Sequence, residues 1–558
     1  MKLFRLFLFA AVATACAGSS PTPAPAPATA PGAEILRAPD APTVAAVTLD
    51  EAPKNWHLLD ETADHIPGIS LDRAMKELLA GKQPKRTVVV AIIDGGIDTA
   101  HMDLKANLWT NPKETPGNKK DDDANGYVDD VRGWNFIGGA DGKDVWHDTF
   151  EVTRELVQCT GGSTGPKPFL SAPEQDRCNM IAADYEQQKA ENAEQIKNYH
   201  EYRDALSSAI PVLKARLGTD SLTLAKVRAI LPDRPELEQA RRVYVGLVSQ
   251  GASLPALDEA IKDLESRRDY ALNPAYNPRS IVGDNYADVT ERRYGNADVT
   301  GPDAKHGTHV AGIIGAVRDN GVGIDGIAPA VRLMGVRAVP DGDERDKDIA
   351  NAIRYAADNG AQIISMSFGK GYSPQKAAVD DAVRYADAKG VLMVHAAGND
   401  GADLGHKKNF PSPVYLDGTR PKNWIEVGAS SWKGGQQLAA SFSNYSKDWV
   451  DVFAPGVDIY SSVPGNKYEQ DSGTSMAAPV VSGLAALIMD YYPNLTAADV
   501  KRVILGSVMR PGGQMVQAPG SGGMPRGPVS FSTLSATGGI VNAYNAIKLA
   551  EQMSGARP

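Results

Sequence analysis

The sequence predicts an α/β fold in which a mostly parallel sheet carries helices on both faces and a helical insertion interrupts the chain. Three uninterrupted apolar runs, at residues 87–93, 362–368 and 391–396, are typical of strands buried on both faces of a parallel sheet. Helical patterns alternate with these runs, as expected when helices connect parallel strands. One long segment, residues 150–280, breaks the alternation.

Local signals predict two of the helices. Apolar residues recur at helical spacing within residues 349–356, and Gly360 can end that helix. A second helix is expected to begin at Ser373, a capping residue, with Pro374 in the first helical position. It should end before Gly390.

The segment 150–280 shows helical periodicity and no strong signal for a buried strand. Apolar residues fall on one helical face with charges between them, which favours an antiparallel helical hairpin. We therefore expect a helical insertion, and its position suggests that it caps or flanks a cleft. The apolar residues are Ile181, Tyr185, Ile196, Tyr199, Leu206 and Ile210, followed by Leu257, Ile261 and Leu264.

Composition excludes several classes of protein. The chain has 558 residues, 42% of them hydrophobic and 23% charged, which is enough apolar material for a sizeable core. With 54 Gly and 37 Pro it is neither fibrous nor wholly disordered. Its net charge of −10 gives no basic face, so we expect no nucleic-acid partner.

The start of the chain has the pattern of a secretory signal. Lys2 and Arg5 precede an apolar run over residues 6–15, which would rise only ~15 Å as a helix and is too short to cross a bilayer. The run ends at Cys16, so residues 1–16 are similar to a bacterial lipoprotein signal whose cysteine becomes lipidated. The alternative is ordinary cleavage nearby, with Cys16 incidental. The lipoprotein interpretation predicts secretion across the inner membrane and a periplasmic or cell-surface protein held to the membrane through Cys16.

Two segments separate this signal from the first strand. Residues 17–33 are rich in Pro and Ala, which favours an extended tether. Residues 34–86 form an N-terminal extension, and within it residues 55–79 are expected to pack on the core. We therefore predict maturation without removal of a large prodomain.

Two cysteines remain once Cys16 is set aside. Cys159 and Cys178 both lie in the insertion. In an oxidising compartment they can pair, and two free thiols are the alternative.

Four residues carry the chemistry of acyl transfer. A serine hydroxyl, here Ser475 in GTSMAAP, needs an adjacent base, and the imidazole of His306 in HGTHVAG titrates in the right range. A carboxylate behind the imidazole, Asp94 in IDGGID, fixes its tautomer and stabilises its cation. The Asn399 amide and the Ser475 N–H would donate to the oxyanion.

The local sequence around these residues is consistent with a site at one edge of the sheet. Asp94 directly follows a strand, at the carboxyl edge where open α/β sheets place their sites. His306 should lie near the start of a helix. Ser475 should open another helix, with Pro479 tolerated in its first turn.

The order Asp, His, Ser and the motifs around them resemble the subtilisin-like serine proteases, or subtilases. The sequence FSNYSKDWVDVFAP at residues 442–455 matches as well, and similarity extends over residues 88–546 outside the insertion. Gly95 stands where Ser or Thr is common, and the separation between Asp94 and His306 is unusually long. The resemblance implies a subtilisin-like three-layer fold and a secreted serine endopeptidase that forms an acyl-enzyme on Ser475 and needs no cofactor for its chemistry.

The resemblance also divides the chain and places the substrate. It implies a catalytic domain in two parts, residues 87–149 and 281–550, with a tail at 551–558. The backbone of one segment would pair with an extended polypeptide substrate, and a second segment would form the other wall of the main specificity pocket. A buried strand end is the alternative for both. The residues concerned are Ser367, Phe368 and Gly369 for the first segment and Ala396, Ala397 and Gly398 for the second.

Two further polar residues in the motifs have other roles by the same resemblance. The family places the base at the first histidine of its motif, so His309 is interpreted as structural. Asp98 is interpreted as a neighbour of the site and not as a catalyst.

An acidic segment at residues 121–130 predicts a calcium loop. Oxygen ligands alternate along it and a glycine permits a sharp turn, but Arg132 stands where an EF-hand has its bidentate Glu, so an EF-hand is excluded. A solvated acidic turn is the alternative. The predicted ligands are the side chains of Asp121, Asp123 and Asn125, the carbonyl of Tyr127, and Asp129 directly or through water.

Two other functions are alternatives to the endopeptidase. A binding or scaffolding protein with a vestigial site is opposed by the intact set of catalytic residues. A carboxyl-serine peptidase that works at acidic pH is opposed by His306 in an intact motif.

Overall fold

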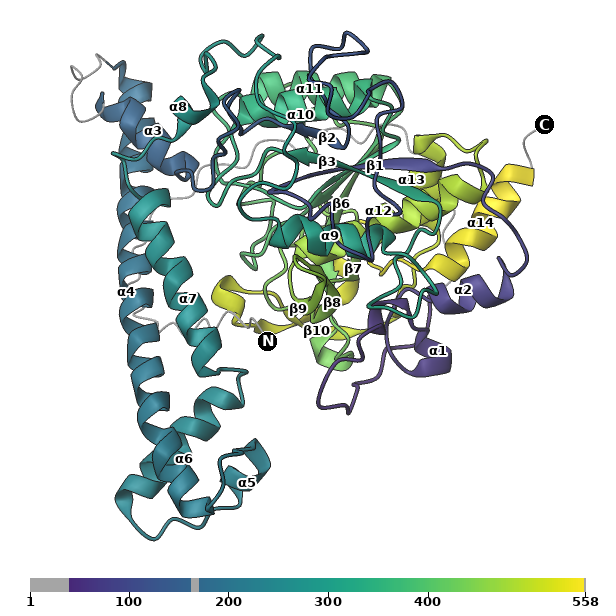
Figure 1. The fold of residues 1–558 in the computed structure, drawn as a ribbon. Helices are drawn as coiled ribbons and strands as arrows, with labels where there is room; N and C mark the ends of the chain where they lie inside the picture. Colours follow the sequence, from purple (N-terminus) through teal and green to yellow (C-terminus); the bar gives the residue numbers. More distant parts are fainter. Residues whose placement is uncertain (1–39, 162–169, 556–558) are drawn as a thin grey trace. The chain divides into compact units, whose positions relative to one another are not determined.

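The computed structural model describes residues 40–161 and 170–555 (Figure 1). The predicted signal and tether, residues 1–16 and 17–33 with Cys16, lie outside the described residues. Contacts divide the chain into two compact units. The smaller unit contains residues 145–280 and 340–343, and the larger unit contains the rest of the described chain.

A seven-stranded sheet forms the centre of the larger unit. Every neighbouring pair of strands in it is parallel. The predicted α/β fold with a parallel sheet is confirmed, and the three apolar runs form strands within two residues of their expected ends. In spatial order the strands are β2 (Gly133–Asn135), β3 (Val331–Arg337), β1 (Val88–Asp94), β4 (Ile363–Met366), β5 (Leu392–Ala396), β6 (Trp424–Ser430) and β7 (Val452–Pro455).

Helices cover both faces of this sheet. Figure 1 shows α10 (Asp346–Asp358) and α11 (Lys376–Ala388) on one side of the strands. On the other side α9 (Lys305–Gly315) packs on α12 (Thr474–Tyr491). Among the described residues α12 alone is long and apolar enough to cross a membrane, but 94% of it is buried in the protein. It is therefore the central helix of the core.

Smaller elements complete the larger unit. They are the antiparallel pairs β8 (Ile459–Val463) with β9 (Lys467–Asp471) and β10 (Met515–Ala518) with β11 (Arg526–Ser530), the helices α1 (Glu61–Asp64), α2 (Leu71–Glu77), α13 (Ala497–Gly506) and α14 (Ala543–Gly555), and the short turns Trp56–Leu58, Gly435–Gln437, Ser521–Gly523 and Phe531–Thr533. One further helix, α8 (Arg279–Val282), lies where the chain passes from one unit to the other.

The predicted start of the second helix is wrong by two to three residues. Ser373 does not cap α11, which begins at Lys376. Instead the Ser373 hydroxyl and the Gln375 amide both donate to Asp346 Oδ2, at 2.9 and 2.7 Å. A carboxylate from α10 thus takes over the capping role, and a local sequence signal cannot reveal it.

The N-terminal extension is part of the core of the larger unit. Trp56, Ile69 and Leu71 are completely buried in the same apolar cluster as α12. The Trp56 indole donates to the carbonyl of Val457 at 3.0 Å, and the Ala543 amide donates to that of Ile69 at 2.6 Å. These contacts join the extension to segments far along the chain.

The smaller unit is helical, as the periodicity of the insertion predicts. The long helix α4 (Ala172–Leu217) packs along α6 (Pro235–Val248) and α7 (Leu254–Ser266), so two helices form the returning arm of the expected hairpin. Ile196 and Ile210 are only half-buried, whereas the other apolar residues named from the sequence are buried. The unit also contains α3 (Glu151–Thr160), α5 (Leu224–Arg228) and a π-helical turn at Arg267–Ala271.

The two cysteines of the insertion form a disulfide. Cys159 in α3 is bonded to Cys178 in α4. The alternative of two free thiols is thereby excluded for this structure.

Candidate active site

Asp94 and His306 meet at the carboxyl edge of the sheet. Asp94 is the last residue of β1, and His306 is the second residue of α9. His306 Nδ1 donates to the Asp94 carboxylate, 2.9 Å from each oxygen. Asp94 is 4% exposed and His306 41%, so the carboxylate is buried behind an imidazole whose other side faces outward.

A glycine permits this approach. A Cβ at Gly307 would lie 2.2 Å from the carbonyl oxygen of Gly96 and 3.1 Å from Asp94. A larger residue at this position would therefore push α9 away from the loop that follows β1.

The electrostatics of His306 are dominated by acidic neighbours. Burial alone would lower its pKa. The charge and hydrogen bond of Asp94, with smaller contributions from Asp471 and Asp303, instead raise the pKa of His306 to about 9. The imidazolium is thus strongly stabilised at this position.

Ser475 lies at the start of α12, in reciprocal contact with Ser367. Its hydroxyl donates to the carbonyl of Ser367 at 3.1 Å, and the Ser367 hydroxyl donates to the carbonyl of Ser475 at 2.9 Å. Pro479 explains the second bond, because a proline lacks the N–H that would bind the carbonyl four residues earlier in a helix. Pro479 is the sixth residue of α12, so the expectation that it lies in the first turn is wrong.

The Asn399 side chain faces the same helix start. Its Oδ1 accepts from the Thr474 amide at 2.9 Å and from the Thr474 hydroxyl at 3.0 Å. The Nδ2 group is therefore left to donate elsewhere, and a Cβ at Gly473 would lie 3.5 Å from it. An amide donor thus lies beside the backbone that leads into Ser475.

Asn409, which sequence reasoning missed, joins the two predicted substrate walls. Its Nδ2 donates to the carbonyl of Ala396 at 3.1 Å. A Cβ at Gly369 would lie 2.4 Å from Asn409 Oδ1, so only glycine allows this packing. Ala397, on the second wall, is fully buried, and Gly398 donates its amide to the Thr474 hydroxyl at 3.0 Å.

His309 and Asp98 make structural contacts. His309 is buried, with Nε2 3.0 Å from the carbonyl oxygen of Ile459 and 3.2 Å from that of Glu469. The Asp98 carboxylate accepts from the amides of Ala100 and Gly465, at 2.9 Å in each case.

Comparison with known proteins adds the family. A family model described as the subtilase family matches residues 85–522, which is most of the chain. The chain belongs to the subtilase family. The match confirms the resemblance to this family that the sequence motifs show.

Several relatives share part of the sequence of this subtilase. A thermophilic serine proteinase of Bacillus sp. (strain AK1) is 40% identical over 44% of this chain and 54% of its own length. Subtilisin DY of Bacillus licheniformis is 39% identical over 35% of this chain and 67% of its own length. The first of these matches thus spans about half the relative's length. A solved structure of a protease from Pseudoalteromonas arctica is 26% identical, with a TM-score of 0.37 over 46% of this chain and 78% of that one.

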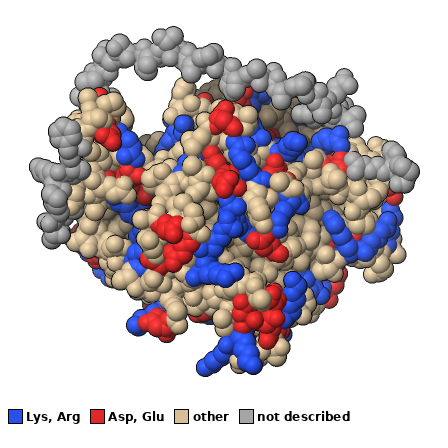
Figure 2. All heavy atoms as spheres, turned by 90° about the horizontal axis from the view of Figure 1, so that it is seen from above, with Lys and Arg blue, Asp and Glu red and all other residues tan. Residues whose placement is uncertain are grey.

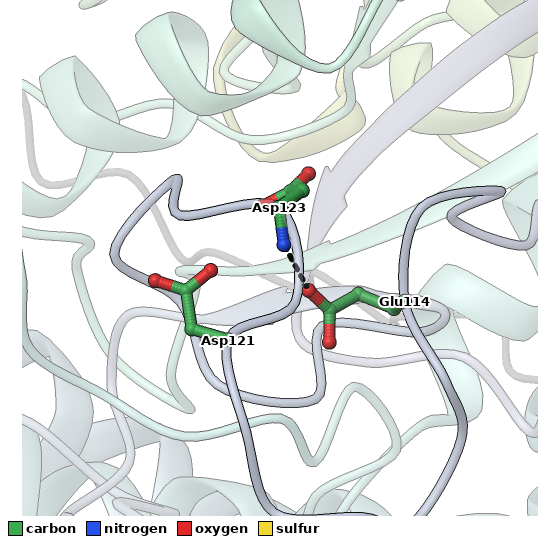
Figure 3. A group of neighbouring side chains, drawn as sticks. All are labelled: Glu114, Asp121 and Asp123. Carbon is green, nitrogen blue, oxygen red and sulfur yellow. Dashed lines mark hydrogen bonds between the residues drawn. The ribbon is translucent and has the colours of Figure 1, made fainter.

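The acidic loop of this subtilase brings together Asp121, Asp123 and a residue outside the motif, Glu114 (Figure 3). Carboxylate oxygens of these three residues lie within 4.8 Å of one another. Glu114 Oε1 accepts from the amides of Asp122 and Asp123, at 2.9 and 3.3 Å. Its Oε2 is buried without a hydrogen-bond partner. Oxygen-only donors and an orphaned buried carboxylate oxygen fit a calcium ion.

The other predicted ligands, Asn125, Tyr127 and Asp129, stay a prediction, and their side chains make contacts within and beside the loop. Asn125 Oδ1 accepts from the Tyr127 amide at 2.7 Å, so this oxygen is used within the loop. Tyr127 donates its hydroxyl to the carbonyl of Arg292 at 3.1 Å. The two oxygens of Asp129 accept from the amides of Gly117 and Lys119. Asp121 and Asp123 also accept amide hydrogen bonds in the loop, so such bonds alone do not separate ligands from other residues.

Charges of both signs are mixed on the face of the subtilase shown in Figure 2. Lys and Arg side chains there are interspersed with Asp and Glu side chains. This mixture agrees with the small excess of acidic over basic residues in the sequence.

Proposed function

We propose that this subtilase is a serine endopeptidase in which Ser475, His306, Asp94 and Asn399 carry the reaction. The observation that supports this most directly is the contact of His306 Nδ1 with the buried Asp94 carboxylate at 2.9 Å. It fixes the tautomer that leaves Nε2 free to accept a proton. The 39–40% identity to a serine proteinase and a subtilisin supports the same activity.

The reaction begins when the Ser475 side chain leaves the carbonyl of Ser367 and turns to His306. The imidazole takes the hydroxyl proton as the oxygen attacks the peptide carbonyl carbon. Asn399 Nδ2 and the Ser475 N–H stabilise the oxyanion. His306 then gives the proton to the leaving amine, the acyl-enzyme remains on Ser475, and water attacking through the same base releases the acid.

The substrate in this proposal is an extended polypeptide. Rotation of Ser475 frees the carbonyl of Ser367, which can then accept an N–H from the substrate. Residues 367–369 pair with the chain as an added strand, and residues 396–398 form the opposite wall of the pocket. Small residues on that wall leave room for a substrate side chain.

Substitution of Ser475 tests the activity. Ser475→Ala should lower the rate of casein digestion by about 10⁶-fold and abolish labelling by a fluorophosphonate probe, while the melting temperature stays unchanged. Ser482→Ala is the matched control, because Ser482 lies in the same helix with its hydroxyl bonded to Ser365 and Ala478. A Ser475→Ala protein that digests casein as fast as the parent would refute the proposal.

We also infer that Glu114, Asp121 and Asp123 bind a structural calcium ion. The ion would neutralise clustered carboxylates and give the buried Glu114 oxygen a partner. Calcium should raise the melting temperature of the parent protein, and chelator should reverse the rise. Glu114→Gln should abolish the response, whereas Asp141→Asn, which changes an exposed acid outside this cluster, should keep it. A response that survives Glu114→Gln would exclude this ligand set.

Secretion and lipid anchoring at Cys16 complete the proposal. Two basic residues, a short apolar run and a Pro-rich segment after Cys16 support it. Labelled palmitate should be incorporated into the parent protein and not into Cys16→Ser. Equal incorporation into both proteins would count against anchoring at this residue.

A further inference from the structure

A buried histidine and glutamate lie directly beside the segment proposed to bind substrate. His395 on β5 and Glu426 on β6 are register partners in neighbouring strands, with 0% and 1% exposure. His395 Nδ1 lies 2.9 and 3.1 Å from the two oxygens of Glu426. Its Nε2 lies 2.9 Å from the carbonyl oxygen of Phe368. Both ring nitrogens therefore face oxygen atoms, Nδ1 those of Glu426 and Nε2 that of Phe368.

Packing of the sheet does not by itself require a buried polar pair at these two positions. Burying charged groups in a sheet is unfavourable unless every group is paired, and apolar residues of similar size would serve the core at least as well. Here the pairing is complete, because the Trp424 indole donates to the second Glu426 oxygen at 2.8 Å. The contact that links the pair to the segment proposed to bind substrate is the one from His395 to Phe368.

That contact fixes the direction of a peptide group. The carbonyl of Ser367 faces Ser475, and the next carbonyl, that of Phe368, faces His395. In a trans peptide the carbonyl and the following N–H point in opposite directions. The N–H of Gly369 therefore points away from His395, toward the side on which Ser367 meets Ser475.

Strand pairing gives this N–H a role. Along an extended strand, groups two residues apart point to the same side. If the carbonyl of Ser367 accepts the N–H of the substrate residue at the cleaved bond, the N–H of Gly369 donates to a carbonyl two residues earlier in the substrate. We propose that His395 and Glu426 are positioning residues that hold the Phe368–Gly369 peptide for this pairing. The inference rests on the proposed endopeptidase function. It implies that the pair promotes cleavage of extended chains and has little effect on single-residue substrates.

A comparison of long and short substrates tests the role. His395→Ala alone leaves Glu426 buried without its histidine and can fail to fold. The double substitution His395→Ala with Glu426→Ala removes both groups, so it is the informative variant. Its kcat/KM for a tetrapeptide anilide should fall about tenfold, mainly through KM, while its kcat/KM for a single-residue ester with the same cleaved residue stays within about twofold of the parent.

The control perturbs the same buried cluster without touching Phe368. Trp424→Phe removes the other donor to Glu426 and should leave the ratio of the two kcat/KM values as in the parent. Equal losses of the double variant on both substrates, or no loss on either, would overturn the positioning role and leave the protease assignment intact. Failure of the parent to cleave either substrate would instead overturn the proposed function, and the inference with it.

Discussion

At the scale of single residues, the charge environment of His306 sets the pH dependence expected of the enzyme. Only the neutral imidazole can accept the serine proton, and acidic neighbours raise its pKa to about 9. The neutral fraction therefore grows as the pH rises toward this value. We expect kcat/KM for a peptide amide to rise about tenfold per pH unit below about 9 and to level off above it.

Asp471 offers a variant that tests the cause. Its charge raises the pKa of His306 without contacting the ring as Asp94 does. Asp471→Asn should shift the midpoint of the pH profile downward and keep most of the maximal rate, whereas Asp94→Asn should lower that rate by about 10⁴-fold. A midpoint that moves upward in Asp471→Asn would contradict this electrostatic account.

Asp490, near the end of α12, should couple the stability of the fold to pH. Its side chain is fully buried and neither oxygen has a hydrogen-bond partner of ordinary geometry. Burial raises its pKa from 3.8 to about 8, and the charge of Arg86 and the amides of Ala330 and Val88 offset only part of that effect. Between these two values the folded chain holds a proton that the unfolded chain has lost, so stability falls as the pH rises.

Asp490→Asn removes this titration. At pH 9 the variant should exceed the parent in the free energy of unfolding by about 2 kcal/mol, and at pH 5 the difference should be smaller. Urea unfolding at the two pH values measures both differences. A variant whose advantage is larger at pH 5 would show that the carboxyl is ionised and favourably paired.

At the scale of elements, the disulfide ties α3 to the long helix of the smaller unit. Cys159 and Cys178 are separated by 19 positions, and closing a loop of this length in the unfolded chain stabilises by about 3 kcal/mol. The double substitution of both cysteines by serine should lower the stability of this unit by about that amount. Unfolding by urea measures the loss, and alkylation without prior reduction should leave both cysteines of the parent unmodified. Modification of both residues would show that the bond does not form.

The elements also show how far a sequence can predict structure. Three of the seven strands of the sheet, β1, β4 and β5, agree with the prediction to within two residues, because long apolar runs report burial on both faces directly. The start of α11 cannot be predicted from its own sequence, because its cap is a carboxylate from α10. Glu114 lies outside the spacing of the acidic motif and reaches it only through the fold. His395 and Glu426 lie in apolar runs. A polar residue in such a run indicates that it has a buried polar partner, but only the strand register identifies that partner.

At the scale of the whole molecule, the N-terminal extension helps to bury the apolar core of the larger unit. Trp56, Ile69 and Leu71 belong to the same buried cluster as Val480 and Leu484 of α12, whose second residue is the catalytic serine of the proposed mechanism. A chain that lost the extension would expose this apolar surface to water. A removable prodomain would instead be expected to leave a closed core behind.

The mature, active protein should therefore retain residues 40–84. Mass spectrometry of the purified enzyme should find this segment, and a chain that begins at residue 85 should be insoluble or unfolded. Trp56→Ala should lower the free energy of unfolding by about 4 kcal/mol, because it leaves a large cavity and an unpaired Val457 carbonyl. Leu49→Ser, at a site that is 50% exposed, should change it by less than about 0.5 kcal/mol. A fully active enzyme whose N-terminus lies near residue 85 would instead show that the core closes without the extension.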